Sequence, residues 1–175
     1  KDIFLVKMDG SLSYVRITND TDFDSSPVIG GVDAVTGNVT VLFVSNKGGV
    51  IGIWKQVVNP VSNALVGAQA LITNNVVDGV RQMSVSPDYT KFAFVKNVSG
   101  VSHVMVMPVS GGTEVDLGVG ASPSWALNGI NRIMYTANSA LWAINQDGTG
   151  KMQVPVPSNL SPGSLSGVVF GPAGF

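Results

Sequence analysis

The only histidine of the chain, His103, is the first candidate for chemistry, because imidazole is the most frequent general base in enzymes. A nucleophilic triad would need it beside an activated serine and a carboxylate. The G-x-S-x-G turn that presents such a serine occurs nowhere in the sequence. His103 stands just before an apolar, strand-like run. We therefore expect a solvated histidine in a turn, with no catalytic role.

The strongest carboxylate cluster is formed by Asp20, Asp22 and Asp24, which alternate in the stretch NDTDFDSS. Alternating oxygen ligands in a loop could hold Ca²⁺. The EF-hand pattern also requires Gly at its sixth position and Glu at its twelfth, where Ser25 and Gly31 stand. The favoured interpretation is a solvated connecting loop in which Asp24 helps to tie a turn, and calcium remains the alternative.

The three tryptophans, Trp54, Trp125 and Trp142, could be stacking platforms for sugars or peptides. Each occupies a position that Phe, Val, Ile or Met fills in other copies of an internal repeat described below, so packing in the core is the favoured interpretation. The glycine pairs Gly48-Gly49 and Gly111-Gly112 lack the lysine of a phosphate loop and indicate turns.

The composition excludes several classes of function. The chain has 175 residues, no cysteine, a net charge of −1 and 12% charged residues, and its few Lys and Arg are scattered. Without a basic stripe, nucleic-acid binding is not expected. The lack of cysteine removes disulfides, thiolate chemistry and Cys-ligated metals. We expect no enzyme, no cofactor and no membrane-spanning segment.

The stretch Gly120–Gly150 best shows the element pattern of the chain. It predicts strands at Ser122–Trp125, Arg132–Ala137 and Leu141–Asn145, and a fourth follows at Lys151–Val154. Asn-Gly and Asp-Gly pairs between the strands tolerate the positive φ of tight hairpin turns, which favours an antiparallel meander. Such a small sheet cannot bury both of its faces alone, so several must stack.

Large apolar residues recur in register along the chain. Phe43, Phe94 and Tyr135 occupy one position of the second strand, at spacings of 51 and 41 residues. Two other positions recur in the same way: Ile29, Val85, Trp125 and Phe170 at the end of the first strand, and Phe4, Trp54, Met105 and Trp142 in the third. The repeat predicts a β-propeller of four-stranded antiparallel blades, and a two-sheet sandwich is the alternative.

The repeat divides the chain into a partial blade at 1–19, three blades at 24–74, 80–118 and 120–154, and the start of another at 165–175. We expect all of them to form one propeller domain or a segment of it. The first complete blade should have strands at Ser26–Ile29, Val39–Ser45, Val50–Gln56 and Ala70–Thr73. A crossing at Asn19–Ser26 precedes it, and Val57–Gln69 forms a long hairpin loop within it.

Several motifs resemble the WD40-like "PD40" repeats of TolB-type β-propellers. They are Ser122-Pro123-Ser124-Trp125, Val85-Ser86-Pro87-Asp88, Lys91–Val95, and the run Asp2–Ser11 that contains Asp9-Gly10. Leu71-Ile72-Thr73 and Arg16-Ile17-Thr18 are similar to the closing strand of that repeat. The sequence departs from the pattern after Trp125, where Ala-Leu-Asn-Gly replaces Ser-Pro-Asp-Gly. The resemblance implies a propeller fold and a location outside the cytoplasm.

Three functions stay open at this point. The first is a non-catalytic, periplasmic or extracellular propeller that binds a protein or peptide or acts as a scaffold. The second is the propeller portion of a larger secreted hydrolase of the prolyl-oligopeptidase type. The third is a structural subunit that self-assembles, with partial blades completed between copies as a homo-oligomer. The incomplete end blades favour a part of a larger or multi-chain propeller over a self-closed ring of four blades.

Overall fold

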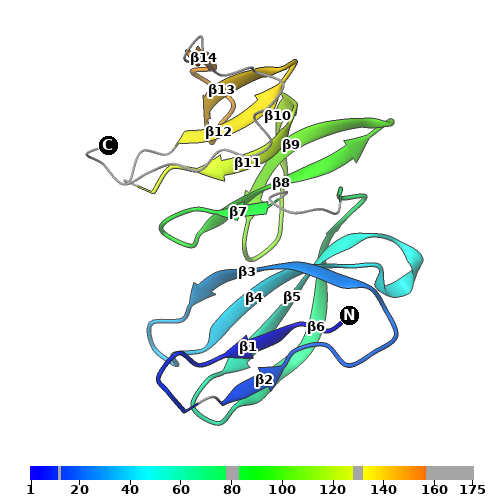
Figure 1. Ribbon diagram of the computed structural model, residues 1–175, viewed down its shortest axis with the longest axis vertical. Helices are drawn as coiled ribbons and strands as arrows, with labels where there is room; N and C mark the ends of the chain where they lie inside the picture. Colours follow the sequence, from blue (N-terminus) through cyan, green and yellow to red (C-terminus); the bar gives the residue numbers. More distant parts are fainter. Residues whose placement is uncertain (12, 78–82, 128–131, 157–175) are drawn as a thin grey trace. The chain divides into compact units, whose positions relative to one another are not determined.

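The computed structural model describes residues 1–11, 13–77, 83–127 and 132–156 of the chain. These residues form fourteen strands, one 3₁₀ turn and no α-helix (Figure 1). The strands make up one two-stranded sheet and three four-stranded sheets. The chain divides into two compact units, Lys1–Asp78 and Gly79–Phe175.

The first unit contains two antiparallel sheets. The smaller pairs β1 (Phe4–Val6) with β2 (Tyr14–Arg16). The larger has the order β3-β4-β5-β6 and consists of β3 (Asp24–Val32), β4 (Val39–Ser45), β5 (Gly52–Asn59) and β6 (Ala64–Asn74). A 3₁₀ turn, η1 (Lys47–Gly49), joins β4 to β5.

The second unit contains two four-stranded meanders, in which each strand pairs with the next strand in sequence. One consists of β7 (Met83–Val85), β8 (Lys91–Val98), β9 (Val101–Pro108) and β10 (Val115–Val119). The other consists of β11 (Ala121–Trp125), β12 (Arg132–Ala137), β13 (Ala140–Asn145) and β14 (Met152–Val154). The all-β fold of four-stranded antiparallel blades, predicted from the repeat, is confirmed.

The register of the strands also confirms the aromatic repeat. Phe43 lies opposite Trp54, Phe94 opposite Met105, and Tyr135 opposite Trp142. The second strand of each complete sheet therefore places its aromatic residue beside the same position of the third strand. All three aromatic side chains are buried.

The first-strand position of the repeat is equivalent in register but not in environment. The second-strand partners of this position are Val41 for Ile29, Phe92 for Val85 and Ile133 for Trp125. Each partner stands two residues before the repeated aromatic residue of its own strand. Trp125 is buried, whereas Ile29 is 39% exposed. The fourth expected member, Phe170, and the partial blade at 165–175 lie outside the described residues, as do parts of the Asn128-Gly129 turn.

Face-to-face packing of sheets builds the core within each unit. In the second unit, Trp125, Ile133 and Tyr135 pack against Val104 and Val106 of the neighbouring sheet. In the first unit the β1–β2 sheet packs in the same way on the larger sheet, through the cluster of Ile3, Val15, Ile17, Val41, Phe43 and Val58. Side chains of the repeat therefore fill the space between sheets, where burial of apolar area stabilises the fold.

Most of the long hairpin loop expected at Val57–Gln69 is strand, and only residues 60–63 form the turn. β5 continues to Asn59 and β6 begins at Ala64, so the two strands extend as a long hairpin. The Asn59 side chain accepts hydrogen bonds from the N–H groups of Val61 and Ser62, and Asn63 adopts a φ of 52°. Asn and the intervening Pro60 suit such a tight turn, and this leaves the flanking residues free to pair.

The first strand of this sheet, expected at Ser26–Ile29, also differs at both of its ends. β3 already begins at Asp24, which pairs with Ser45, so the crossing expected at Asn19–Ser26 ends early, and the strand continues to Val32. β3 is nine residues long and contains two register shifts, one of them between Ile29 and Gly31. The full length of this irregular strand was not predicted, because its first residues are short and polar or proline and do not show the alternation of polar and apolar residues that indicates a strand.

Carboxylates stabilise the turns that join the strands. Asp88, between β7 and β8, accepts hydrogen bonds from the Ser86 hydroxyl at 2.6 Å and from the Thr90 N–H at 3.1 Å. The Ser86 hydroxyl is the main reason that the pKa of Asp88 lies below its usual value. Hydroxyl groups two residues further on likewise lower the pKa of Asp9 and Asp147.

Asp88→Asn should reduce stability at neutral pH, because it removes a charge that the turn stabilises. The pKa of the Asp88 carboxyl is lower in the folded state than in the unfolded state. Its contribution to the free energy of unfolding is therefore present above the unfolded-state pKa and is lost as the pH falls through the folded-state pKa. Asp88 is largely exposed, so we expect a loss below about 1 kcal/mol at pH 7, which shrinks as the pH falls through the folded-state pKa. Urea unfolding at pH 7 and in acid measures the difference, and Ser86→Ala should make it smaller. An Asn variant whose deficit persists unchanged in acid would contradict this role.

Tyr135 provides a matched pair of substitutions for the packing between sheets. Its ring is fully buried, and its hydroxyl has no hydrogen-bond partner among the described residues. Tyr135→Phe should therefore be neutral or slightly stabilising. Tyr135→Ala should cost about 3–5 kcal/mol because it opens a cavity between the two sheets. Chemical denaturation of both variants measures the contrast, and similar losses for the two would show that the ring does not fill a core.

Candidate binding surface

The free edge of β1 is the first component of the candidate surface. The Ile3 carbonyl accepts a hydrogen bond from the N–H of Ile17, just after β2, at 2.8 Å, and the Lys7 N–H donates one to the Ser13 carbonyl, just before β2, at 2.9 Å. In an antiparallel pair, hydrogen-bonded residues alternate with residues whose N–H and C=O point to the opposite side. Phe4 and Val6 therefore direct their backbone groups away from β2, towards an edge that no described strand covers.

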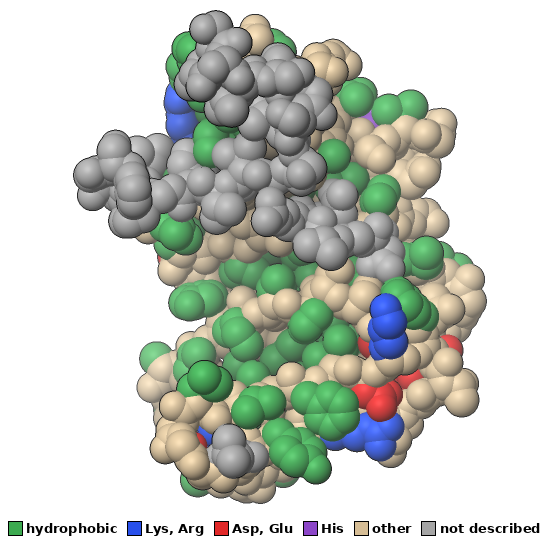
Figure 2. Space-filling model, in the orientation of Figure 1, with side chains coloured by type: hydrophobic (Ala, Val, Ile, Leu, Met, Phe, Trp, Pro, Cys, Tyr) green, Lys and Arg blue, Asp and Glu red, His purple; other side chains and the backbone are tan. Residues whose placement is uncertain are grey.

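The second component is the outer face of the β1–β2 sheet. Its inner face, with Ile3 and Val15, is buried against the larger sheet of the unit. On the outer face Phe4, Val6 and Tyr14 are 49%, 51% and 62% exposed. The rings of Phe4 and Tyr14 contact each other edge to face, with centroids 5.8 Å apart. Hydrophobic side chains also gather over β1 and β2 in Figure 2.

The third component is an apolar groove between β1 and β3 with a volume of about 180 Å³. Eight residues line it, none of them charged or polar: Ile3, Phe4, Leu5, Ile17, Pro27, Val28, Ile29 and Val41. The groove therefore adjoins the free edge of β1 on the side that faces the larger sheet. Edge, outer face and groove together are called the β1 surface below.

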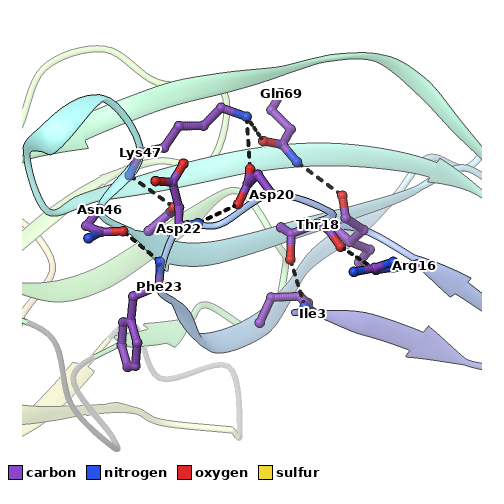
Figure 3. A network of polar contacts seen from close by, with 11 residues as sticks. Ile3, Arg16, Thr18, Asp20, Asp22, Phe23, Asn46, Lys47 and Gln69 are labelled. Atoms are coloured by element: carbon purple, nitrogen blue, oxygen red, sulfur yellow. Dashed lines mark hydrogen bonds and ion pairs between the residues drawn. The ribbon is translucent and has the colours of Figure 1, made fainter. Parts of the chain in front are cut away.

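A polar network holds this surface in place (Figure 3). The buried Thr18 accepts a hydrogen bond from the Ile3 N–H through its Oγ1 at 2.9 Å, which fixes the start of β1. Arg16 donates from Nε to the Thr18 carbonyl at 3.0 Å and forms an ion pair with Asp2. Arg16 and Thr18 therefore anchor the end of the two-stranded sheet at which β1 begins and β2 ends.

The same network includes part of the predicted carboxylate cluster. Lys47 Nζ lies 3.4 Å from Asp20 and 2.8 Å from the Gln69 side-chain oxygen, and Gln69 Nε2 donates to the Ile17 carbonyl at 3.1 Å. Asp20 also accepts a hydrogen bond from the Asp22 N–H. Asp20 thus ties the crossing between the two sheets to β6 and η1.

The three aspartates of the calcium hypothesis have different surroundings. Asp20 is exposed, Asp22 is half-buried, and Asp24 is buried in β3 with neither carboxylate oxygen hydrogen-bonded. Among residues 1–11, 13–77, 83–127 and 132–156, no group of three or more Asp, Glu, His or Cys side chains is placed to hold a metal. Calcium binding by these residues stays a prediction.

His103 lies inside β9, so the expectation of a turn histidine is wrong. Its Nδ1 is 2.9 Å from Asp116 on β10, and its side chain is 20% exposed. The register shift next to Asp116 re-aims that carboxylate, which also accepts a hydrogen bond from the Gly118 N–H. The sequence did not reveal this pairing, because the two residues meet only across neighbouring strands.

The three tryptophans pack in the cores, as expected. Trp125 is buried between the sheets of the second unit, and Trp142 packs against the same cluster. Trp54 packs against the cluster of the first unit. Lys47 lies over the Trp54 ring at 5.6 Å, and Lys151 over the Trp142 ring at 4.8 Å. These contacts leave less ring surface for ligand stacking.

In the described part of the chain, no helix combines the length and the hydropathy needed to cross a membrane.

Solved structures with the same fold are found by comparison. The chain is similar to a protein described as TolB from Agrobacterium tumefaciens, with a TM-score of 0.65 and 16% identity over 90% of this chain and 56% of that one. It is also similar to TolB from Acinetobacter baumannii, with a TM-score of 0.55 and 20% identity over 84% of this chain and 36% of that one. A structure of a nidogen/laminin complex matches with a TM-score of 0.52 and 12% identity, over 84% and 52% of the two chains.

No protein-family model matches the chain, and no curated protein matches it. At these identities the similarity shows the fold alone: the sheets are blades like those of TolB-type β-propellers. The chain spans between about a third and just over half of the lengths of the structures that it resembles.

Thr18→Val should loosen the β1 surface, because it leaves the buried Ile3 N–H without its acceptor at constant shape. We expect a loss of about 1–3 kcal/mol and faster amide exchange at Ile3. The matched control is Thr21→Val, at an exposed residue of the same connection, which should change stability by less than about 0.5 kcal/mol. Hydrogen exchange and denaturation measure both. Unchanged exchange at Ile3 in the Thr18 variant would show that this contact does not fix β1.

Proposed function

We propose that this chain is part of a non-catalytic β-propeller that binds or scaffolds another protein outside the cytoplasm. The observation that carries the proposal is the apolar outer face of the β1–β2 sheet, where Phe4, Val6 and Tyr14 are each about half-exposed or more. Contiguous apolar patches of this kind on water-soluble domains mark interaction sites. One of the structures with this fold is a nidogen/laminin complex, so a related fold takes part in a protein complex there.

The non-catalytic assignment is supported by the scarcity of reactive groups. The sequence has no cysteine and a single histidine, and it lacks a nucleophile elbow. Nδ1 of that histidine contacts Asp116. A location outside the cytoplasm is supported by the low charge content of 12% and by the resemblance of the repeat motifs to TolB-type propellers.

Self-assembly is a second candidate that the same surface supports. An uncovered strand edge pairs readily with a strand of a second copy. Sedimentation of the purified chain over a range of concentrations distinguishes the two functions, since only self-assembly predicts a concentration-dependent mass.

A photo-cross-linking amino acid at Tyr14 should capture a partner in the producing cells, because this side chain belongs to the β1 surface. The matched control is Val35, which is 94% exposed but lies in the turn between β3 and β4. We expect a discrete adduct from position 14 and none from position 35, as seen by gel electrophoresis and mass spectrometry. Equal adducts at both positions, or none at either, would refute a binding role for this surface.

A further inference from the structure

Asp24 is a buried carboxylate for which the described residues of the first unit supply no counter-charge. It is 2% exposed, and neither of its oxygens has a hydrogen-bond partner among those residues. A buried charge is strongly unfavourable unless it is paired or coordinates a metal. We propose that Asp22 and Asp24 bind a Ca²⁺ ion where the crossing between the two sheets enters β3. This site does not depend on the proposed protein-binding function.

The basic side chains of the first unit do not neutralise these two aspartates. Among residues 1–11 and 13–77, no ion pair includes Asp22 or Asp24. The counter-charge of Asp24 therefore has to come from outside the described residues, and a metal ion is small enough to reach a buried carboxylate. Three basic side chains of the unit have other contacts: Arg16 pairs with Asp2, Lys47 pairs with Asp20, and Lys1 lies over the Phe23 ring at 4.8 Å.

The pairing of β3 with β4 shows which side chain faces Asp24. Asp24 lies opposite Ser45, and in the pair before it the Asn46 N–H donates a hydrogen bond to the Phe23 carbonyl at 3.3 Å. Hydrogen-bonded and non-hydrogen-bonded pairs alternate in an antiparallel ladder. Asp24 and Ser45 therefore form a non-hydrogen-bonded pair, in which side chains approach most closely. The buried hydroxyl of Ser45 is a neutral oxygen beside the carboxylate.

Asp22 supplies a second carboxylate on the same side of the chain. The Phe23 N–H donates to the Asn46 side chain at 2.7 Å, so the contacts between the two chain segments continue beyond the start of β3. Successive side chains of an extended segment point to opposite sides, which places those of Asp22 and Asp24 together. In Figure 3 the ring of Phe23 points away from Asp22. The half-buried Asp22 thus stands between the buried Asp24 and solvent.

Asp20 positions this segment and is not a ligand of the ion. It accepts a hydrogen bond from the Asp22 N–H at 3.1 Å, and it pairs with Lys47 at 3.4 Å. In the described part of the chain no three acidic, His or Cys side chains are placed to hold a metal, so two carboxylates are the most that the site can use. Ca²⁺ takes about six to eight oxygen ligands, and neutral protein oxygens and water complete its shell.

The rigidity of the site favours Ca²⁺ over Mg²⁺. Mg²⁺ requires a near-ideal octahedron and keeps several of its waters, whereas the coordination of Ca²⁺ is flexible. Asp24 is held by the pairing of β3 with β4, so its carboxylate cannot move far to complete an octahedron. Its burial also leaves little room for bound water. The larger ion with the adaptable shell therefore fits this place.

The test uses the full chain, freed of metal with a chelator and then titrated with CaCl₂ at constant ionic strength. Calorimetry should show saturable binding of a single ion per chain, and Ca²⁺ should raise the thermal midpoint of unfolding. Asp24→Asn keeps the shape of the side chain and removes its charge, so it should weaken Ca²⁺ binding about a hundredfold or more. Without Ca²⁺ this variant should be at least as stable as the wild type, because it removes an unpaired buried charge.

Further variants separate this site from general attraction by exposed acids. Asp22→Asn should weaken Ca²⁺ binding about tenfold. The matched control is Asp20→Asn, in the same segment, which should change the affinity by less than about threefold, because Asp20 pairs with Lys47. Circular dichroism checks that the variants fold. Should Asp24→Asn not fold, Ser45→Ala gives the second measurement, since it keeps both carboxylates and should weaken binding by about threefold to tenfold.

Absence of saturable binding up to about 10 mM Ca²⁺ would overturn the proposal, as would equal Ca²⁺ affinities of Asp24→Asn and the wild type. An equal loss in Asp20→Asn and Asp24→Asn would show that the exposed acids bind the ion, and not the proposed site. Mg²⁺ binding as tight as that of Ca²⁺ would overturn the choice of ion. The photo-cross-linking result at Tyr14 has no bearing on these outcomes, so the two proposals fail separately.

Discussion

The thinness of a four-stranded sheet is the constraint on which the rest of this structure depends. Such a sheet has two apolar faces and cannot shield either by itself, so it is stable only against another sheet. In the second unit, Trp125 and Tyr135 meet Val104 across the gap, and in the first Phe43 meets Ile3 and Val15. Large side chains recur in register as a consequence, because the space between each pair of packed sheets must be filled at equivalent positions of the strands.

The β1–β2 sheet follows this rule on one face only. Its inner face is packed, but Phe4 and Tyr14 remain exposed on the other, and the backbone groups of Phe4 and Val6 point away from β2, towards an edge that no described strand covers. Unpaired backbone groups next to apolar surface are usually protected in natural sheets by charge, Pro or a covering segment. Thr18 and the Lys47–Asp20–Gln69 contacts hold this exposed element in place, which is consistent with a surface used for binding.

Polar groups serve the connections between strands in this molecule. Asp88 and Asp147 organise turns through hydrogen bonds from neighbouring hydroxyl and N–H groups, and this is why their pKa values are lowered. Asp20 does the same work across a longer distance by pairing with Lys47. Of the three aspartates that suggested a calcium site, Asp20 thus holds the crossing between the sheets, and Asp24 lies within β3. Among the carboxylates of the described residues, Asp24 is buried and neither of its oxygens has a hydrogen-bond partner.

The strand order, the turns at Asn138-Ser139 and Asp147-Gly148, and the register of Phe43, Phe94 and Tyr135 could be predicted from the sequence, because local turn chemistry and the repeat of large residues follow from the order of residues along the chain. Tertiary structure alone decided the β1 surface and the pairing of His103 with Asp116, since these depend on which residues become neighbours across strands. It also decided the extended β5–β6 hairpin. Neither the exposure of a sheet face nor the openness of an edge is a property of a single strand, and so neither can be predicted from one.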